Sequence, residues 1–208
     1  PLGAQPEVRP VQAAPAAPGG PAPASATATA SQGPVAGARA PVPWRVGERL
    51  QYDIRFGRIR VGQGTIEVVE TENVRGREAY HTRFRIAGGL AFYRVNDVYD
   101  SWIDTRSLHS LRFVKDQDQG GTDRETSFEI YPERQVYQEI GDIERPSVAA
   151  PLDDGSFVYF IRTLPLEVGR TYEFDRYFKP DRNPVRIRVL RRERVKVPAG
   201  TFDAIVVQ

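Results

Sequence analysis

One amphipathic segment stands among stretches that alternate like β-strands, and it constrains the fold more than any other feature. In residues 151–165, apolar side chains recur at the i, i+3, i+4, i+7 spacing of one helical face: Phe157, Phe160, Ile161 and Leu164. Asp153 or Asp154 can cap the first turn, and Pro165 cannot continue the helix. A single apolar helix needs a sheet face to cover, so we expect it on the concave side of a curved sheet.

Most of the remaining chain alternates apolar and polar residues, as half-buried strands do. The pattern predicts strands at residues 50–56, 65–70, 80–86, 92–104, 108–115, 122–131, 134–140, 171–179, 185–197 and 202–208. Gly88 and Gly89 are expected to end the third of them. The predicted fold is mainly β: a single curved antiparallel sheet or open half-barrel of about nine to ten strands, with one helix packed on the concave face.

The composition divides the chain into two parts. Residues 1–43 are rich in Pro and Ala and carry three charged residues, Glu7, Arg9 and Arg39. Such a segment lacks the apolar bulk to offset its ordering entropy, so it is predicted to be a disordered tether. Residues 44–208 are predicted to form one β domain, and the last strand runs to the final residue, so we expect it to be truncated.

Charge and rare residues exclude several classes of function. The chain has a net charge of +2, which gives no concentrated basic field for nucleic acid. It has no Cys, and therefore no disulfide, thiol nucleophile or thiolate metal site. It has no apolar run long enough for a transmembrane segment. A Pro/Ala-rich tether ahead of a cysteine-free β domain suggests a periplasmic or outer-envelope-associated, exported bacterial protein.

No set of residues has the spacing of a catalytic site. His81 and His109 are the two histidines, and each is expected to be an ordinary surface or rim residue without an oriented partner. Ser156 follows two aspartates, but it has no histidine nearby and no Gly-x-Ser-x-Gly turn, so helix capping explains this segment. We therefore expect no catalytic residues and no enzymatic activity; a hydrolase is the weakest alternative.

Carboxylates on the 92–104 strand could suggest calcium, which binds clustered oxygen atoms. Asp97 and Asp100 point to opposite faces of a strand, so their oxygens do not converge. The prediction is no metal and no cofactor.

A basic stripe lies near the C-terminal end. Alternation places the same-parity residues on one side: Arg186, Arg188, Arg192, Arg194 and Lys196. These side chains could contact an anionic surface, such as lipid headgroups or an anionic glycolipid. Alternatively, they protect an edge strand from aggregation.

Several short motifs in fixed order resemble a known family. They are residues 52–54, 61–62, 99–104, 153–165 with Gly169, and the 197–202 turn. Together they resemble bacterial exported proteins grouped as domain-of-unknown-function family 3108, over residues 47–208. The resemblance implies an envelope location and a curved antiparallel sheet similar to lipoprotein-carrier folds. It implies no reaction and no catalytic residues.

Aromatic residues are the remaining signal for function. A curved sheet with one helix can be incompletely filled, which leaves an apolar concavity. The predicted lining residues are Tyr99, Trp102, Phe157 and Phe160. The leading hypothesis is a non-enzymatic envelope binding module for a lipid-like or hydrophobic ligand. The alternative is a structural or assembly protein that docks another envelope component, an envelope protein, through its basic edge.

Overall fold

The computed structural model describes residues 39–90 and 93–208. The predicted tether therefore lies outside the described residues as far as position 38. Residues 39–43, which the composition assigns to the tether, contact the domain: Arg39 forms an ion pair with Glu78, and the Ala40 amide donates to the Thr105 carbonyl oxygen over 2.8 Å. Val42 packs against the cluster that contains the buried Trp44, so residues before position 44 take part in the domain.

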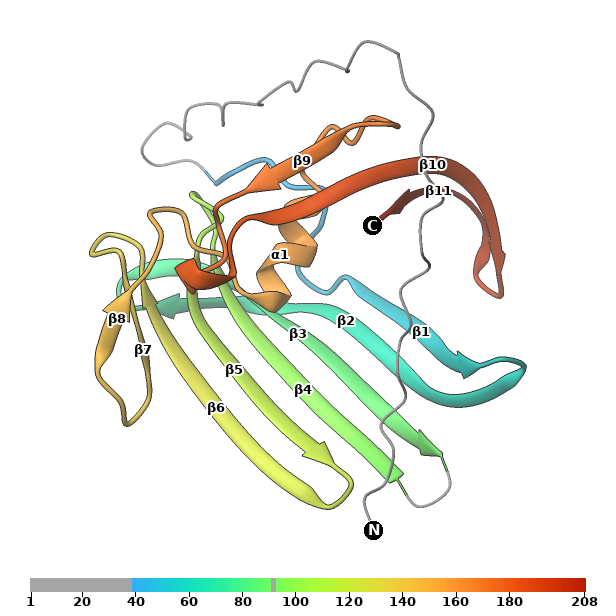
Figure 1. The fold of residues 1–208 in the computed structure, drawn as a ribbon, viewed down its shortest axis with the longest axis horizontal. Helices are drawn as coiled ribbons and strands as arrows, with labels where there is room; N and C mark the ends of the chain where they lie inside the picture. Colours follow the sequence, from blue (N-terminus) through green and yellow to red (C-terminus); the bar gives the residue numbers. More distant parts are fainter. Residues whose placement is uncertain (1–38, 91–92) are drawn as a thin grey trace, which may run out of the picture.

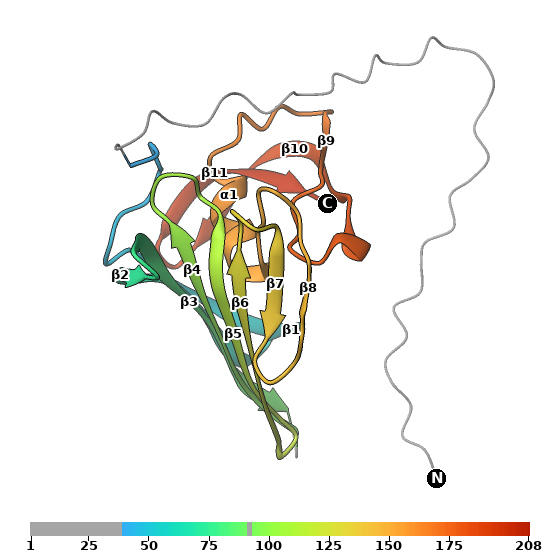
Figure 2. The ribbon, with the colours of Figure 1, turned by 90° about the vertical axis from the view of Figure 1, so that its left-hand side faces the viewer.

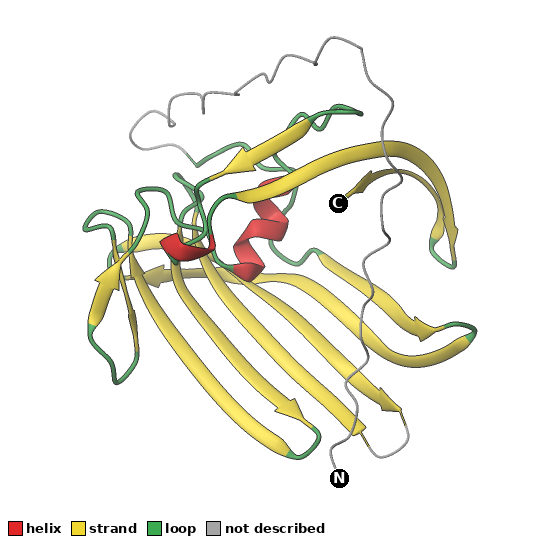
Figure 3. Ribbon diagram, in the orientation of Figure 1, coloured by secondary structure: helices red, strands yellow, loops and turns green. Residues whose placement is uncertain are grey.

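The larger of two sheets has eight antiparallel strands, each paired with the next along the chain (Figure 1). They are β1 (Arg49–Phe56), β2 (Ile59–Val74), β3 (Arg77–Leu90), β4 (Tyr93–Asp104), β5 (Ser110–Gln119), β6 (Thr122–Tyr131), β7 (Val136–Glu139) and β8 (Glu144–Pro146). The sheet is curved and open, with β1 and β8 at its edges (Figure 3). The third strand continues through Gly88 and Gly89, contrary to the sequence prediction.

A second, three-stranded sheet follows the helix. It consists of β9 (Thr171–Phe174), β10 (Val185–Val197) and β11 (Gly200–Val207), with β10 in the centre, and a short 3-10 helix, η1 (Pro180–Arg182), precedes β10. The prediction of one sheet was therefore wrong. The mainly β class was predicted correctly, as was one α-helix among the described residues, but these residues form eleven strands rather than nine to ten.

The helix α1 (Asp154–Ile161) lies between the two sheets (Figures 1 and 2). Asp153 is its N-cap: the carboxylate accepts the amides of Gly155 and Ser156, and the Ser156 hydroxyl accepts the Asp153 amide. α1 contacts β3 and β4 of the large sheet on one side. On the other side, Phe157 and Phe160 pack edge-on against Phe174 of β9.

The position of the helix reverses the predicted direction of its apolar face. Phe157 and Phe160 point to the small sheet, whereas Tyr159, 3% exposed, packs with Trp44, Tyr80 and other residues of the large-sheet side. The concave face is still the face that α1 covers. The helix is shorter than predicted and ends at residue 161.

Two aromatic clusters form the core: the first connects the large sheet to the chain around the small sheet, and the second connects the large sheet to α1. One is centred on Phe113, Phe128 and Phe178, and it joins β5 and β6 to the segment between β9 and β10. The other contains Trp44, Tyr80 and Tyr159. No helix among residues 39–90 and 93–208 has the length and apolar character that a bilayer crossing requires.

Candidate functional site

A pocket of about 280 Å³ lies between the N-terminal half of α1 and the inner face of the large sheet. The sheet contributes one wall, from β2, β3 and β4; it includes Ile66, Thr82, Phe84, Ile86 and Tyr99. The helix contributes the other wall, with Asp154, Gly155, Val158 and Tyr159. Val158 is 43% exposed, so solvent reaches this wall. Most of the lining is aliphatic or aromatic.

The strand register explains why these sheet residues share a wall. In antiparallel strands, directly opposed residues point to the same face. Ile66 opposes Phe84, and Phe84 opposes Tyr99, so the three side chains form a row across β2, β3 and β4. Phe84 and Tyr99 also stack, with ring centroids 5.9 Å apart.

Gly64 opens the wall of the pocket toward β1. It lies between Tyr52 of β1 and Ile86 of β3 in the register, on the same inner face. A methyl group added at Gly64 would lie 3.9 Å from the Phe84 ring and 4.0 Å from Ile54, in ordinary contact with both. The missing side chain therefore leaves room for a small group between these two residues, although Gly64 itself is buried.

The edge strand β1, which pairs with β2 at Gly64, carries an apolar row. Leu50, Tyr52 and Phe56 alternate along this strand and are 38%, 49% and 72% exposed. Their polar neighbours occupy the opposite face, where Arg49 forms an ion pair with Glu67. Exposed apolar side chains that continue from an apolar pocket are typical of a surface that binds another apolar group.

The polar groups of the pocket gather at the start of α1. Asp154 accepts a hydrogen bond from Tyr177 over 2.9 Å, and its other oxygen forms an ion pair with Lys115. The Tyr99 hydroxyl donates to Asp97 over 3.2 Å and accepts from Gln117 over 3.1 Å. Burial and the nearby Asp97 carboxylate raise the pKa of Tyr99, so its hydroxyl remains a neutral donor.

Of the four predicted lining residues, Tyr99 lies in the pocket wall. Trp102 lies on the opposite face of the sheet, where it stacks on His81. Phe157 and Phe160 contact Phe174 on the side of α1 that faces the small sheet. The structure therefore does not bring the four together.

Sequence reasoning missed most of the wall. Phe84 shares its face with Tyr80 in the alternation of β3, which was a usable signal. Val158 and Tyr159 of α1 gave none, because they lie outside the apolar spacing of that helix.

The basic residues of β10 do not form one stripe. Val189 pairs with Val207 and Arg191 with Val206, so β10 has one extra residue, a bulge at Leu190. The bulge inverts the alternation: Arg186 and Arg188 point to one face, and Arg192, Arg194 and Lys196 point to the other. The prediction of a common side was wrong. The edge-strand alternative fails for Arg186 and Arg188, which pair with β9, but it fits Arg192, Arg194 and Lys196, which pair with β11 and with no other described strand.

Neither histidine is an ordinary surface residue. His81 is 7% exposed, and its Nε2 lies 2.8 Å from Asp100 Oδ1. His109 is half-buried beside the α1 attachment, and burial lowers its pKa from 6.5 to about 4, with nearby Arg176 and Arg77 adding to the effect. The expectation of a surface or rim residue without an oriented partner was wrong for His81, whereas half-buried His109 fits a rim position.

A buried polar cluster fastens α1 to the large sheet. Ser101 of β4 donates to the Asp153 carboxylate over 2.6 Å, and the hydroxyls of Ser110 and Ser156 are 2.7 Å apart. Burial raises the pKa of Asp153 from 3.8 to about 6, against the hydrogen bonds that favour its ionised form. Ser156 is thus used in the cap, as the sequence indicated.

Asp97 and Asp100 point to opposite faces of β4, as predicted. Asp97 is bonded to Gln119 and Tyr99 on the inner face, and Asp100 to His81 and Arg83 on the outer face.

Comparison with known proteins gives a family but no function. No curated protein and no solved structure matches the chain. A family pattern matches residues 51–208, which is most of the chain and nearly all of the two-sheet domain. The chain belongs to the family described as Protein of unknown function (DUF3108).

Proposed function

We propose that this protein is a non-enzymatic binding module for a lipid-like or other hydrophobic ligand. The observation that carries the proposal is the apolar pocket between α1 and β2–β4, together with the exposed apolar row on the neighbouring strand β1. Ligand pockets are typically concave and mostly apolar, with a few polar groups that fix orientation. Asp154 and the Tyr99 hydroxyl are such groups here.

The size of the pocket indicates how a ligand would lie. About 280 Å³ is close to the lower end of the range of about 300–1,000 Å³ for small-molecule sites. The pocket suits one end of a chain-like molecule. The rest of that molecule would pass Gly64 and lie against Tyr52 and Phe56. There it would cover apolar surface that water now contacts.

The polar groups of the pocket support binding more than a reaction. Thr82 donates its hydroxyl to the Ser101 carbonyl oxygen, and Asp154 is paired with Lys115 and Tyr177. None of these three arrangements pairs a nucleophile with a base that could activate it. The proposal includes an exported, envelope location, which the Pro/Ala-rich N-terminal composition supports.

A substitution at Gly64 tests the binding site. Gly64→Leu places a large side chain between Phe84 and Ile54. The backbone is not strained, because the φ angle of Gly64 is not in the left-handed region and the nearest atoms lie 3.9 Å from the added Cβ. Thr65→Leu is the matched control, since Thr65 lies on the same strand and points to the outer face. Native mass spectrometry after gentle purification, and titration with a fluorescent fatty acid, measure binding.

We expect the wild-type protein and Thr65→Leu to bind the fatty acid and Gly64→Leu to lose binding while it keeps its thermal unfolding temperature. A wild-type protein that is purified empty and takes up no fatty acid contradicts the proposal. Equal binding by both leucine variants also contradicts it.

A second candidate function is docking on an anionic lipid surface through the β10–β11 hairpin. Arg192, Arg194 and Lys196 are exposed and form no salt bridge with a described residue. Val197 and Phe202 next to them are 41% and 52% exposed. Basic residues beside exposed apolar side chains are the composition that favours a membrane interface.

A further inference from the structure

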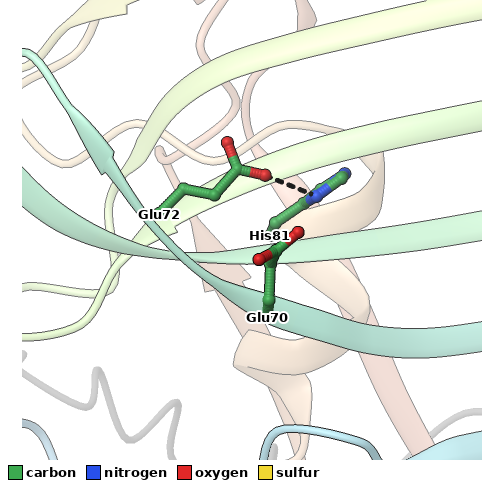
Figure 4. A group of neighbouring side chains, drawn as sticks. All are labelled: Glu70, Glu72 and His81. Atoms are coloured by element: carbon green, nitrogen blue, oxygen red, sulfur yellow. Dashed lines mark ion pairs between the residues drawn. The ribbon is translucent and has the colours of Figure 1, made fainter.

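A group of three side chains on the outer face of the large sheet lies away from the pocket. Glu70 and Glu72 come from β2 and His81 from β3 (Figure 4). One donor atom from each residue lies within 4.8 Å of the other two. Donors bound to a zinc ion at 2.0–2.2 Å are about 3.4 Å apart in tetrahedral geometry, so this spread is close to that of a zinc site.

A β-bulge brings the two glutamates to this face. Val68 opposes Thr82 on the inner face, and Glu70 opposes His81 on the outer face, so Val69 is the extra residue. Without the bulge, Glu70 and Glu72 would point to the inner face, toward the helix. Bulges commonly re-aim side chains at functional sites.

His81 points an unpaired nitrogen at the glutamates. Its side chain is 9% exposed, and its Nδ1 has no hydrogen-bond partner. Glu72 Oε1 lies only 2.8 Å from Nδ1, but outside hydrogen-bonding geometry. A buried imidazole nitrogen that faces a carboxylate oxygen at this distance needs a cation or a proton between them.

The other ring nitrogen has the partner that a metal-bound histidine usually has. His81 Nε2 donates to Asp100 Oδ1 over 2.8 Å, which leaves the lone pair on Nδ1. Metal-binding histidines commonly donate their second N–H to a carboxylate in this way, which fixes the tautomer. Arg83 binds both oxygens of Asp100 and balances its charge.

Trp102 orients both of the other groups. Its ring stacks on His81 with centroids 4.5 Å apart and an interplanar angle of 7°. Its Nε1 donates to Glu72 Oε2 over 3.0 Å, which leaves Oε1 directed at the imidazole. Glu70 is exposed and forms no ion pair with a described residue, so it is available as a ligand.

We propose that Glu70, Glu72 and His81 bind a divalent transition-metal ion, with zinc as the best fit. Imidazole nitrogen with carboxylate oxygen is a donor set that zinc accepts, and three protein ligands leave a position for water or a partner group. The ion balances the two glutamates, since Asp100 is already paired with Arg83. Asp100 and Trp102 are positioning residues for this site.

The experiment titrates the full chain with zinc chloride by calorimetry and follows histidine side-chain ¹⁵N signals by NMR. The chain has two histidines, so each imidazole can be assigned. We expect one zinc ion per chain and a zinc-induced shift of the Nδ1 signal of His81, with its Nε2 still protonated. A shift confined to His109, or an Nδ1 of His81 that stays protonated in excess zinc, overturns the proposal.

Variants distinguish residues that bind the metal ion from residues that only stabilise the fold. Glu70→Gln changes an exposed side chain that the fold does not use, and it should weaken zinc binding by about tenfold or more. Asp100→Asn should weaken it by roughly 10- to 100-fold and change the tautomer signal of His81. Glu125→Gln, an exposed acid on the same face, is the matched control and should bind as the wild type does. Equal affinity of Glu70→Gln and the control overturns the proposal.

Discussion

Asp153 is the residue on which the attachment of α1 to the large sheet depends most. It is fully buried, caps the helix, and accepts the Ser101 hydroxyl from β4. One of its oxygens, Oδ2, has no hydrogen-bond partner among the described residues, so ionisation leaves charge on a buried, unpaired oxygen. The cap could be predicted from sequence, because an Asp directly before a helical pattern of apolar residues is a local signal. The burial of the carboxylate depends on β4 and β5, which local spacing does not describe.

The raised pKa of Asp153 makes stability depend on pH. Because the carboxyl has a pKa of about 6 in the folded protein and 3.8 as its ordinary value, its protonated form favours folding. This contribution is complete below pH about 4 and is lost as pH rises through about 6. We expect Asp153→Asn to remove the loss, which amounts to roughly 2–3 kcal/mol in the free energy of unfolding between pH 4 and 7.

Urea unfolding at several pH values measures this difference. Asp116→Asn is the control, since that side chain is exposed and forms no ion pair with a described residue. It should keep the wild-type slope. Identical slopes for the wild type and Asp153→Asn would show that Asp153 does not titrate in this range.

Glycines at the residue scale show why one sequence expectation failed. Gly88 and Gly62 oppose each other, and a Cβ at Gly88 would lie 2.3 Å from the Val61 carbonyl oxygen. Close backbone packing requires glycine there, so the strand continues where the sequence predicted a break. Glycine is expected both where a strand ends and where two backbones pack closely. Only the position of the neighbouring strand distinguishes the two cases.

At the scale of elements, bulges decide which way side chains point. Alternation is a local signal, and it located β10 and the middle of β2, although β2 spans residues 59–74 rather than 65–70. The bulges at Val69 and Leu190 invert that alternation, and nothing in the local pattern marks them. One bulge creates the Glu70–Glu72–His81 group, and the other divides the basic residues of β10. The β10 bulge is therefore the cause of the error in the predicted basic stripe.

Because the basic residues of β10 are divided between two faces, only some of its arginines are expected to contact a lipid surface. Arg192 and Arg194 lie beyond the bulge, near the exposed Phe202. Replacing both by Glu should lower binding to vesicles that contain anionic lipid by roughly 30-fold or more, since each basic residue near such a surface contributes about 1 kcal/mol. Co-sedimentation with the vesicles measures this.

Arg45→Glu with Arg58→Glu makes the same change in net charge at exposed positions outside the hairpin. This control pair should bind nearly as the wild type does. If both double variants lose binding equally, net charge alone is responsible and the hairpin is not the docking surface.

At the scale of the whole molecule, the sequence indicated a mainly β fold with one helix on a concave face, but not the division into two sheets. Alternation does not show whether β9 pairs with β8 or begins a new sheet, because α1 separates the two strands along the chain. In the structure they belong to different sheets. Phe157 and Phe160 face the small sheet, so the helix has two sheets to cover rather than one.

This two-sheet arrangement places the two proposed surfaces on different elements, and hydrogen exchange can tell them apart. The pocket is bordered by α1 and by β2, β3 and β4, whereas the basic hairpin is formed by β10 and β11. A fatty acid should slow amide exchange in α1 and β2–β4 and leave β10–β11 unchanged, because bound ligand protects the elements that it contacts. Anionic vesicles should slow exchange in β10–β11. Protection of the same elements by both additions would mean that one surface serves both, and that the pocket and the hairpin are not independent sites.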